Sequence, residues 1–456
     1  MLYSDLIFIY GLLPITVLLT FLDRSTEYKN LILVLTSVVF FTFGKPIIIL
    51  MLFSTVILDY LFGLIAGYGR TKILRASGFF FSIVMNSALF ILFSWNSIFK
   101  NLGIESLTFT KKLIPICISF YTIKGISYVG DVYKKRIKAE KNIFCLLVYM
   151  VSYHFMIVGP IVRYGDISNQ IRRRTITGQN LNDGLNRFII GFAKVIILGT
   201  AFGKIKTAGL NLNELTPFGA WMGMAAFIGS IYFLFTGYTD MAMGLGALGG
   251  FRYKENFSPI NLSEYVSGIV KGFNKLLVEF FEDFLVVPFK TDKIKYISGV
   301  LLSGILIGFW YGFSQHFMIF GIYFALLVII EKLFLKRVLD KLPKIVGYVY
   351  TLFAVFIGSA IAYFSDLESF ALWFKALFGI NTDYMWSVNM RNKTLSYLFL
   401  IIIGLFIMFP GLKNAIKSQL EAFGAKNERN YAAVRISQTA GICLLLIMAT
   451  ASSITV

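Results

Sequence analysis

The chain has 456 residues, of which 57% are hydrophobic and 15% are charged, and 47 of them are phenylalanine. No arrangement of such a chain hides this much apolar surface in a water-soluble core, which excludes a soluble globular protein. The net charge of +19 lies in basic residues of short loops, a pattern that membrane topology explains without nucleic acid. The composition therefore predicts a polytopic membrane protein whose main partner is the lipid bilayer.

Apolar segments of about the length that crosses a bilayer recur from one end of the chain to the other. The predicted spans lie near residues 5–22, 30–44, 46–67, 76–96, 112–130, 143–162, 184–203, 216–236, 296–312, 316–334, 346–365, 396–412 and 436–452. Several of them are expected to be broken or re-entrant. We predict an all-α polytopic fold that forms one integral membrane domain over residues 1–456.

Four basic loops predict the orientation of the chain in the membrane. They lie at residues 67–75, 133–142, 332–344 and 411–435. Two predicted spans separate the first loop from the second, and two separate the third from the fourth, as a return to the same face requires. The positive-inside rule places these loops in the cytoplasm and the less basic connections 97–111 and 366–395 outside. A small-molecule transporter has little support, because no pair of matching broken helices is found in two halves.

Charged residues just beyond the ends of predicted spans mark a first group of candidate site residues. The guanidinium fork of Arg163 suits the phosphates of a substrate or a nearby carboxylate. Asp131 and Asp240 are not expected to face lipid, and they would pair with Lys124, Lys194 or Arg163. Structural ion pairs are the alternative to a binding role for all of these residues, and that alternative is slightly preferred.

The segment 262–285 departs from the spanning pattern. Its apolar residues recur at helical spacing and form one face. The opposite face carries Glu264, Lys271, Asn274, Lys275, Glu279, Glu282 and Asp283. We predict one amphipathic helix that lies at the membrane interface or lines a polar cavity. A plain surface-lying helix is the alternative.

The segment 308–324, GFWYGFSQHFMIFGIYF, places Tyr311 and His316 in an otherwise apolar stretch. Polar groups inside a membrane are costly to bury and usually serve a function. A helix over 296–309 would be about 20 Å long, too short for a hydrocarbon core of about 30 Å. The turn after Trp310 is therefore expected at depth in the membrane, beside a cavity.

The three cysteines have unrelated spacings and predict neither a metal site nor a disulfide framework.

Five local sequences resemble motifs of one family, the membrane-bound O-acyltransferases. They are LIPICISFYTIKGISYVGDVY at 113–133, GPIVRY at 159–164, GLNRFIIGFAK at 184–194, FTGYTDMAMGLG at 235–246 and FRYKENF at 251–257. Their order and spacing follow the family from about residue 30 to residue 380. The chain resembles in particular the bacterial, AlgI/DltB-like branch of that family.

The resemblance implies a fold of about 11–13 transmembrane or re-entrant helices around a central tunnel. It also implies transfer of an acyl group from a cytoplasmic thioester, acetyl-CoA or an acyl carrier protein, with no bound cofactor. The acceptor would be an extracellular polysaccharide, a cell-wall polymer or a relay protein, and the chain would be a multi-pass protein of the bacterial plasma membrane. The basic cytoplasmic loops suit an anionic donor.

Two family motifs that carry the chemistry are altered in this chain. Lys271-Gly272-Phe273-Asn274 lies where the branch has Arg-Arg-Trp-His, so Asn274 occupies a histidine position. The family's essential histidine follows Trp310 in the aligned motif, and here it is replaced by Tyr311. A tyrosine is a poor general base at neutral pH, because its pKa is near 10, but it donates hydrogen bonds well.

His316 is the candidate substitute for the missing histidine. Five residues along a helix correspond to a rotation of about 140° and a rise of ~7.5 Å, so a regular helix would not bring His316 to the position of Tyr311. A break at Gly312 would remove this obstacle. A hydrogen-bonded histidine at a helix turn, with no role in chemistry, is the alternative.

We therefore predict Tyr311, His316 and Asn274 as catalytic residues, no metal ligands, and Arg163, Trp310, Lys271 and Asp240 as substrate- or donor-binding residues. The predicted function is acylation, with O-acetylation favoured, of an extracellular polysaccharide or cell-wall polymer by an altered active site. The alternative is a catalytically inactive subunit that serves a glycosyltransferase or export complex in exopolysaccharide synthesis.

Overall fold

The computed structural model describes residues 1–43, 47–94, 114–155, 162–256, 263–289, 291–312, 314–380, 382, 384–408, 418–419, 422 and 428–455. The regular elements of these residues are all helices. Internal contacts divide them into two compact units, unit 1 with Met1–Phe192 and Gly237–Glu255, and unit 2 with Ala193–Thr236 and Asn256–Val456. The single-domain organisation over 1–456 stays a prediction. Residues 97–111 and 159–161, on which two sequence predictions fall, lie outside the described part.

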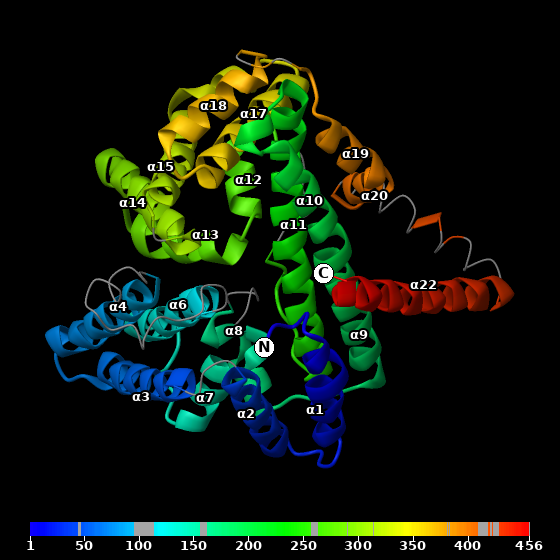
Figure 1. Cartoon of the computed structure of the whole chain (residues 1–456). Coiled ribbons are helices and arrows are strands. Elements are labelled where there is room, and N and C mark those ends of the chain that lie inside the picture. Colours follow the sequence, from blue (N-terminus) through cyan, green and yellow to red (C-terminus); the bar gives the residue numbers. More distant parts are fainter. Residues whose placement is uncertain are drawn as a thin grey trace. The chain divides into compact units, whose positions relative to one another are not determined.

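Unit 1 contains the N-terminal helices (Figure 1). Its elements are η1 (Phe8–Leu12), α1 (Leu13–Thr20), α2 (Thr26–Thr42), α3 (Ile47–Tyr68), α4 (Lys72–Ser94), α6 (Ile114–Tyr133), α7 (Ile143–Val151), η3 (Tyr153–Phe155), α8 (Tyr164–Arg172), most of α9 (Gly178–Ala193) and the last third of α11 (Pro217–Leu248). Stacked and edge-on aromatic rings of Phe8, Phe40 and Tyr153 form part of its core. Aromatic pairs of this kind add packing energy to the burial of their surface.

Glycines explain why two of the quoted motifs, GLNRFIIGFAK and FTGYTDMAMGLG, lie side by side in unit 1. A Cβ at Gly184 would lie 2.8 Å from the carbonyl oxygen of Gly244, and one at Gly244 would lie 2.6 Å from that of Gly184. Such a close approach of two helix backbones requires residues without a side chain. The motif glycines therefore hold α9 against the end of α11.

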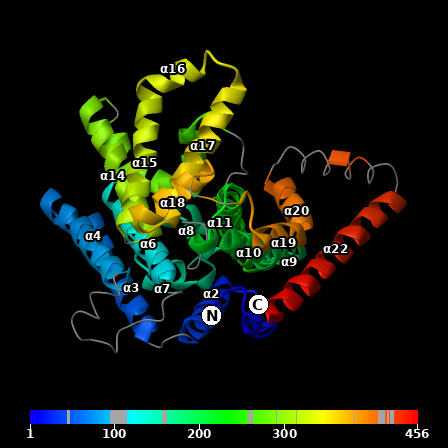
Figure 2. The same cartoon turned by 45° about the horizontal axis from the view of Figure 1, so that its top comes forward.

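Unit 2 contains the remaining helices. Its elements are η4 (Lys194–Gly199), α10 (Thr200–Gly209), η5 (Leu212–Glu214), the first two thirds of α11, α12 (Val266–Gly272), α13 (Lys275–Phe281), η6 (Glu282–Val286), η7 (Val287–Phe289), α14 (Lys293–Tyr311), α15 (Gln315–Ile330), η8 (Glu331–Leu335), α16 (Lys336–Leu339), α17 (Lys344–Tyr363), α18 (Leu367–Leu377), α19 (Val388–Ser396), α20 (Leu398–Met408) and α22 (Glu428–Thr455). Figure 2 shows α15 and α17 joined through α16.

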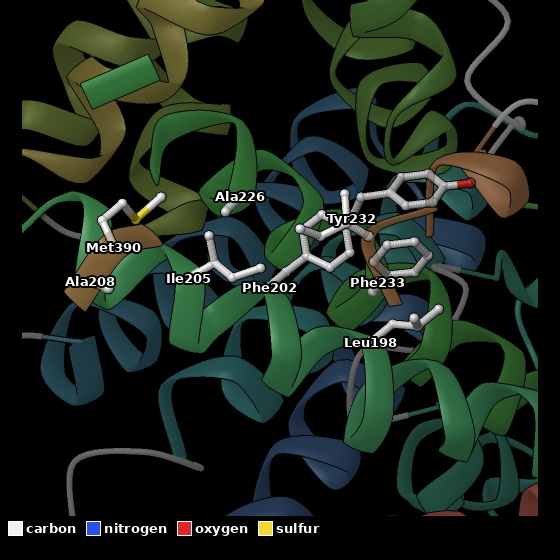
Figure 3. Close-up of a cluster of buried hydrophobic side chains, with 9 residues drawn as sticks. Leu198, Phe202, Ile205, Ala208, Ala226, Tyr232, Phe233 and Met390 are labelled. Carbon is white, nitrogen blue, oxygen red and sulfur yellow. The ribbon is translucent and has the colours of Figure 1, made fainter. Parts of the chain in front are cut away.

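Two hydrophobic clusters hold unit 2 together. Figure 3 shows the first, in which Phe202 of α10 packs against Phe233 of α11, and Met390 of α19 lies beside Ala208 of α10. The second surrounds Trp373 of α18, which is fully buried and donates its indole N–H to the carbonyl oxygen of Ala220. A buried indole needs such a partner, because an unsatisfied N–H in an apolar core is costly.

Helices α14 and α15 form a close antiparallel pair in unit 2 (Figure 1). The Asp292 side chain caps the start of α14 by accepting from the backbone N–H groups of Ile294 and Lys295. Helix α14 ends at Tyr311, and α15 begins at Gln315. The helix is therefore interrupted at Gly312, the position at which the His316 hypothesis requires a break.

Replacing Gly321 of α15 by alanine is expected to destabilise the protein. Its Cβ would clash with the carbonyl oxygen of Gly304 and would lie 3.2 Å from Cα of Gly308. Overpacking costs about 1–3 kcal/mol, which exceeds the roughly 1 kcal/mol that alanine gains over glycine in a helix. Thermal unfolding in detergent measures the loss. Gly441→Ala in α22 is the matched control, because a Cβ there meets nothing within 4 Å; an equal melting temperature for both variants would contradict the prediction.

The predicted all-α polytopic class is confirmed. The extents of two predicted spans differ from the prediction. Eight helices of the described chain are long and apolar enough to cross a membrane, or nine if the bent pair α19 and α20 is one span. The predicted span 143–162 contains only α7 and η3 in its described part, because the Ser152 backbone leaves the helical region at ψ 123°. The predicted span 5–22 is a shorter apolar helix over Phe8–Thr20.

The prediction of one continuous helix over 262–285 is wrong for its described part. The structure has α12 and α13 separated at Phe273 and Asn274. Periodicity of apolar residues persists through the break, so the pattern did not reveal it. The physical cause is the backbone of Asn274, which has φ 55° and ψ 52°.

Candidate active site

Asn274 lies at a helix break in the left-handed region of backbone space. Among non-glycine residues asparagine tolerates this conformation well, because its short side chain makes local hydrogen bonds. The carbonyl oxygen of Asn274 accepts from the N–H groups of Leu277 and Val278, which starts α13. Only 1% of the Asn274 surface is exposed, so its amide group lies inside unit 2.

Asn256 holds the turn at Asn274 together. It belongs to the FRYKENF motif at 251–257. Its backbone carbonyl accepts from the N–H of Lys275 at 3.0 Å, and its side-chain Oδ1 accepts from the N–H of Leu276 at 3.1 Å. Its Nδ2 donates to Oδ1 of Asn274 at 3.1 Å. Asn256 therefore satisfies N–H groups at the start of α13 that have no partner within the helix.

Tyr311 is the last residue of α14, and its half-buried side chain lies within reach of the Asn274 side chain. Aromatic rings surround it: Trp310 at 5.1 Å between centroids, with Phe235 and Phe320 each at 6.1 Å. The structure thus brings together three predicted site residues, Tyr311, Asn274 and Trp310. A hydroxyl and an amide in an apolar surrounding are able to bind a carbonyl oxygen.

His316 lies in the first turn of α15 and is partly buried. Its Nδ1 is 3.1 Å from the hydroxyl oxygen of Ser314, and its ring lies 4.6 Å from that of Phe317. The helix break that the substitution hypothesis requires is present at Gly312. A role of His316 as the replacement base stays a prediction.

Lys271 is at the end of α12, with 60% of its side chain exposed, and its Nζ is 3.2 Å from Oε1 of Glu282. The other end of α12 is held by Glu331, whose carboxylate accepts from the N–H groups of Val266 and Ser267 at 2.6 and 2.9 Å. A carboxylate at a helix N-terminus satisfies free donors and interacts favourably with the helix dipole. The donor-binding role of Lys271 stays a prediction.

Arg163 and Asp131 form an ion pair in unit 1. Nη1 of Arg163 is 3.2 Å from Oδ1 of Asp131, whose side chain is only 4% exposed, and Arg136 approaches the same oxygen at 3.3 Å. The structure shows the carboxylate partner that the sequence offered as one alternative for Arg163. The ion pair neutralises part of the charge of Arg163, and the role of Arg163 in donor binding stays a prediction.

A second carboxylate beside these basic loops, Glu140, interacts with Tyr164 and Arg172. Burial acts to raise the pKa of Glu140, but hydrogen bonds from Tyr164 and from the backbone of Asn142, with the charge of Arg172, hold the pKa below its usual value. Glu140 is therefore a carboxylate at neutral pH. The negative charge of Glu140 thus offsets part of the positive charge of the basic residues that were predicted to attract an anionic donor.

Asp240 pairs with Arg187, a residue of the GLNRFIIGFAK motif that the sequence did not single out. Oδ1 of Asp240 lies 3.0 Å from the Arg187 guanidinium, which also binds Glu255 at 2.7 Å. The pair explains why an arginine and an aspartate occur in these two motifs of unit 1. A donor-binding role of Asp240 stays a prediction.

The sequence analysis also missed Asp59, which is fully buried in α3. Its carboxylate accepts from the Ser82 hydroxyl at 2.8 Å and from the Asn86 amide at 3.0 Å, both on α4. The signal was available, because a carboxylate inside an apolar span is costly and usually has a specific partner. Glu331 offered the same signal, because it lies within the predicted span 316–334, whereas Asn256 offered none, since its importance depends on its contact with Asn274.

The long apolar helices, with buried Asn274 beside Tyr311 at a helix break, define a multi-pass membrane protein that contains a polar site. No known family model matches the chain. It is 26% identical over 443 residues to the probable alginate O-acetylase AlgI of Pseudomonas aeruginosa, covering 94% of this chain and 85% of that protein. The peptidoglycan O-acetyltransferase of Helicobacter pylori is 24% identical over 425 residues, which cover 84% of this chain and 80% of that protein.

A third relative matches a smaller part of the chain. The teichoic acid D-alanyltransferase of Bacillus subtilis is 25% identical over 236 residues, 48% of this chain and 59% of that protein. Together these relatives confirm the predicted resemblance to the membrane-bound O-acyltransferase family, in its AlgI/DltB-like branch. The replacement of the essential histidine by Tyr311 stays a prediction from the aligned motif.

Proposed function

We propose that this protein takes part in the acylation, with O-acetylation favoured, of an extracellular polysaccharide or a cell-wall polymer. The observation that carries the proposal is similarity along nearly the whole chain to proteins named for O-acetylation of alginate and peptidoglycan. A match of this length supports a shared reaction class, which a shared fold alone does not. The bacterial plasma membrane, where such a polymer is reached, is part of the proposal.

The site supports this reaction through groups that bind an acyl oxygen. Asn274 and Tyr311 place an amide and a hydroxyl close together beside Trp310. The proposed donor is an acyl thioester, acetyl-CoA or an acyl carrier protein, and Lys271, Arg163 and Asp240 are its proposed binding residues. His316 is the proposed base, since an imidazole accepts a proton at neutral pH.

Tyr311 itself favours a second candidate function. A phenol at the position of the family's essential histidine is overwhelmingly protonated at neutral pH and accepts a proton poorly. In this alternative the chain is an inactive subunit of a complex for exopolysaccharide synthesis or export. Stable co-purification with a glycosyltransferase or an export protein, together with lack of turnover, would support it.

Purified protein in lipid nanodiscs is expected to consume acetyl-CoA and release free thiol when a polysaccharide or cell-wall acceptor is present. Release of thiol, detected by a chromogenic disulfide reagent, measures the reaction, and transfer of labelled acetate to the acceptor confirms its product. The Asn274→Ala variant shows whether the turnover depends on this site. It is expected to reduce turnover, because it removes the buried amide. A lone protein that is fully active would exclude the scaffold alternative, whereas absence of turnover with every acceptor and donor would contradict the proposed reaction.

A further inference from the structure

The orientation of the Asn274 amide is set by a short series of hydrogen bonds that begins at the backbone. The N–H of Leu276 donates to Oδ1 of Asn256, so the other end of the Asn256 amide must be its NH2 group. That NH2 group donates to Oδ1 of Asn274 at 3.1 Å. The oxygen of Asn274 therefore faces Asn256, and its Nδ2 faces away.

The Nδ2 group of Asn274 is the part of this arrangement that points to a ligand. It is buried and makes no hydrogen bond of good geometry with a described residue, and the Tyr311 oxygen is the group that interacts with it. An NH2 group has two N–H donors, and a buried donor left without a good acceptor is costly, so it is expected to have a use. The Tyr311 hydroxyl lies near the same amide, which places this donor at the altered family motif.

We propose that Asn256 is a positioning residue that fixes the Asn274 amide with its Nδ2 donor directed at the acyl oxygen of the substrate. This inference rests on the proposed function. In the transfer the acceptor oxygen bonds to the acyl carbon, the carbon–sulfur bond breaks, and the hydroxyl proton ends on the released thiol. A fixed donor at the carbonyl oxygen stabilises the negative charge that develops there.

The backbone strengthens the assignment. Asn274 has positive φ, and Asn256 binds Lys275 and Leu276, the two residues that follow it. Asn256 is itself 1% exposed, so water does not compete for these contacts. Asn256 thus fixes both the backbone turn and the direction of the Asn274 side chain.

Asn256→Asp tests the direction of the amide, because aspartate has nearly the same shape. One oxygen of the introduced carboxylate still accepts from the N–H of Leu276. The other oxygen cannot donate to Oδ1 of Asn274 and needs a donor itself. The Asn274 amide is therefore expected to turn, so that its Nδ2 donates to this carboxylate. We expect kcat with acetyl-CoA to fall by about 10- to 100-fold with KM little changed, as for loss of an oxyanion donor. An unchanged kcat in a folded variant would overturn the proposal.

A double-mutant cycle tests the same contact without using activity. Asn274→Gly keeps the left-handed backbone and removes the amide. Asn256→Ala is expected to lower the melting temperature more in the unaltered protein than in the Asn274→Gly protein, because only the former loses the amide contact. Equal losses would show that Asn256 merely caps α13 and would overturn the proposal. If the unaltered protein has no turnover, the proposed function fails, and this cycle still decides whether Asn256 positions Asn274.

Discussion

His316→Ala is expected to abolish acyl transfer. Histidine is the side-chain type whose unperturbed pKa lies closest to neutrality, so among the candidate site residues His316 is the group suited to take the proton from an acceptor hydroxyl. Loss of a general base typically costs about 10²- to 10⁴-fold in rate. The structure supports the test because the helix breaks at Gly312, which frees His316 from the fixed geometry of a continuous helix.

The measurement is thiol release from acetyl-CoA by purified variants at equal protein concentration. Ser314→Ala is the matched control, since it removes the hydroxyl that lies 3.1 Å from the His316 ring and leaves the imidazole in place. Only a modest loss is expected for that control. Turnover of His316→Ala equal to that of the unaltered protein would rule out His316 as the base.

Tyr311→His is expected to raise turnover, and in the scaffold alternative to create it. The change restores an imidazole of pKa about 6.5 at the family's essential position, in place of a phenol of pKa about 10. The side chain at 311 already lies beside Asn274 and between aromatic rings, so the new base would meet the same surroundings. A gain on the order of 10²-fold is expected for a general base at neutral pH.

The same assay measures this gain, and Tyr311→Phe serves as its control. Phenylalanine keeps the ring that packs against Trp310 and Phe320 and supplies neither a base nor a donor. It is expected to lower turnover, or to leave an inactive protein inactive. If the histidine variant is folded and no more active than the unaltered protein, Tyr311 is not what limits the reaction.

Much of the fold was predictable because its signals are local. Apolar runs predicted the helices around 46–67, 184–203 and 346–365, since crossing a bilayer depends on the length and polarity of one segment. The glycine-containing motifs were recognised by resemblance, and the structure supplies their physical reason in the contact of Gly184 with Gly244. The helix break at Gly312 was named only as a condition for a role of His316, and the structure shows that it is present.

The site was predicted less completely. Tyr311, Trp310 and Asn274 were named from aligned motifs, and the structure brings them together. Arg187 and Glu331 were missed although each is a charged residue within a predicted span, and their partners, which lie far along the chain, were not predictable. Glu331 lies 65 residues from Val266, the backbone group that it caps. No spacing rule connects positions so far apart.

The sequence by itself determined the class of protein, its apolar spans and its family resemblance, because composition and ordered motifs need no knowledge of contacts. Only the tertiary structure decided that segment 262–285 is broken and that Asn256 holds the break. Those two residues, Asn256 and Asn274, are 18 positions apart and meet only in the folded chain. Apolar periodicity continues through Asn274 unchanged, whereas its backbone angles and the direction of its amide follow from hydrogen bonds that form on folding.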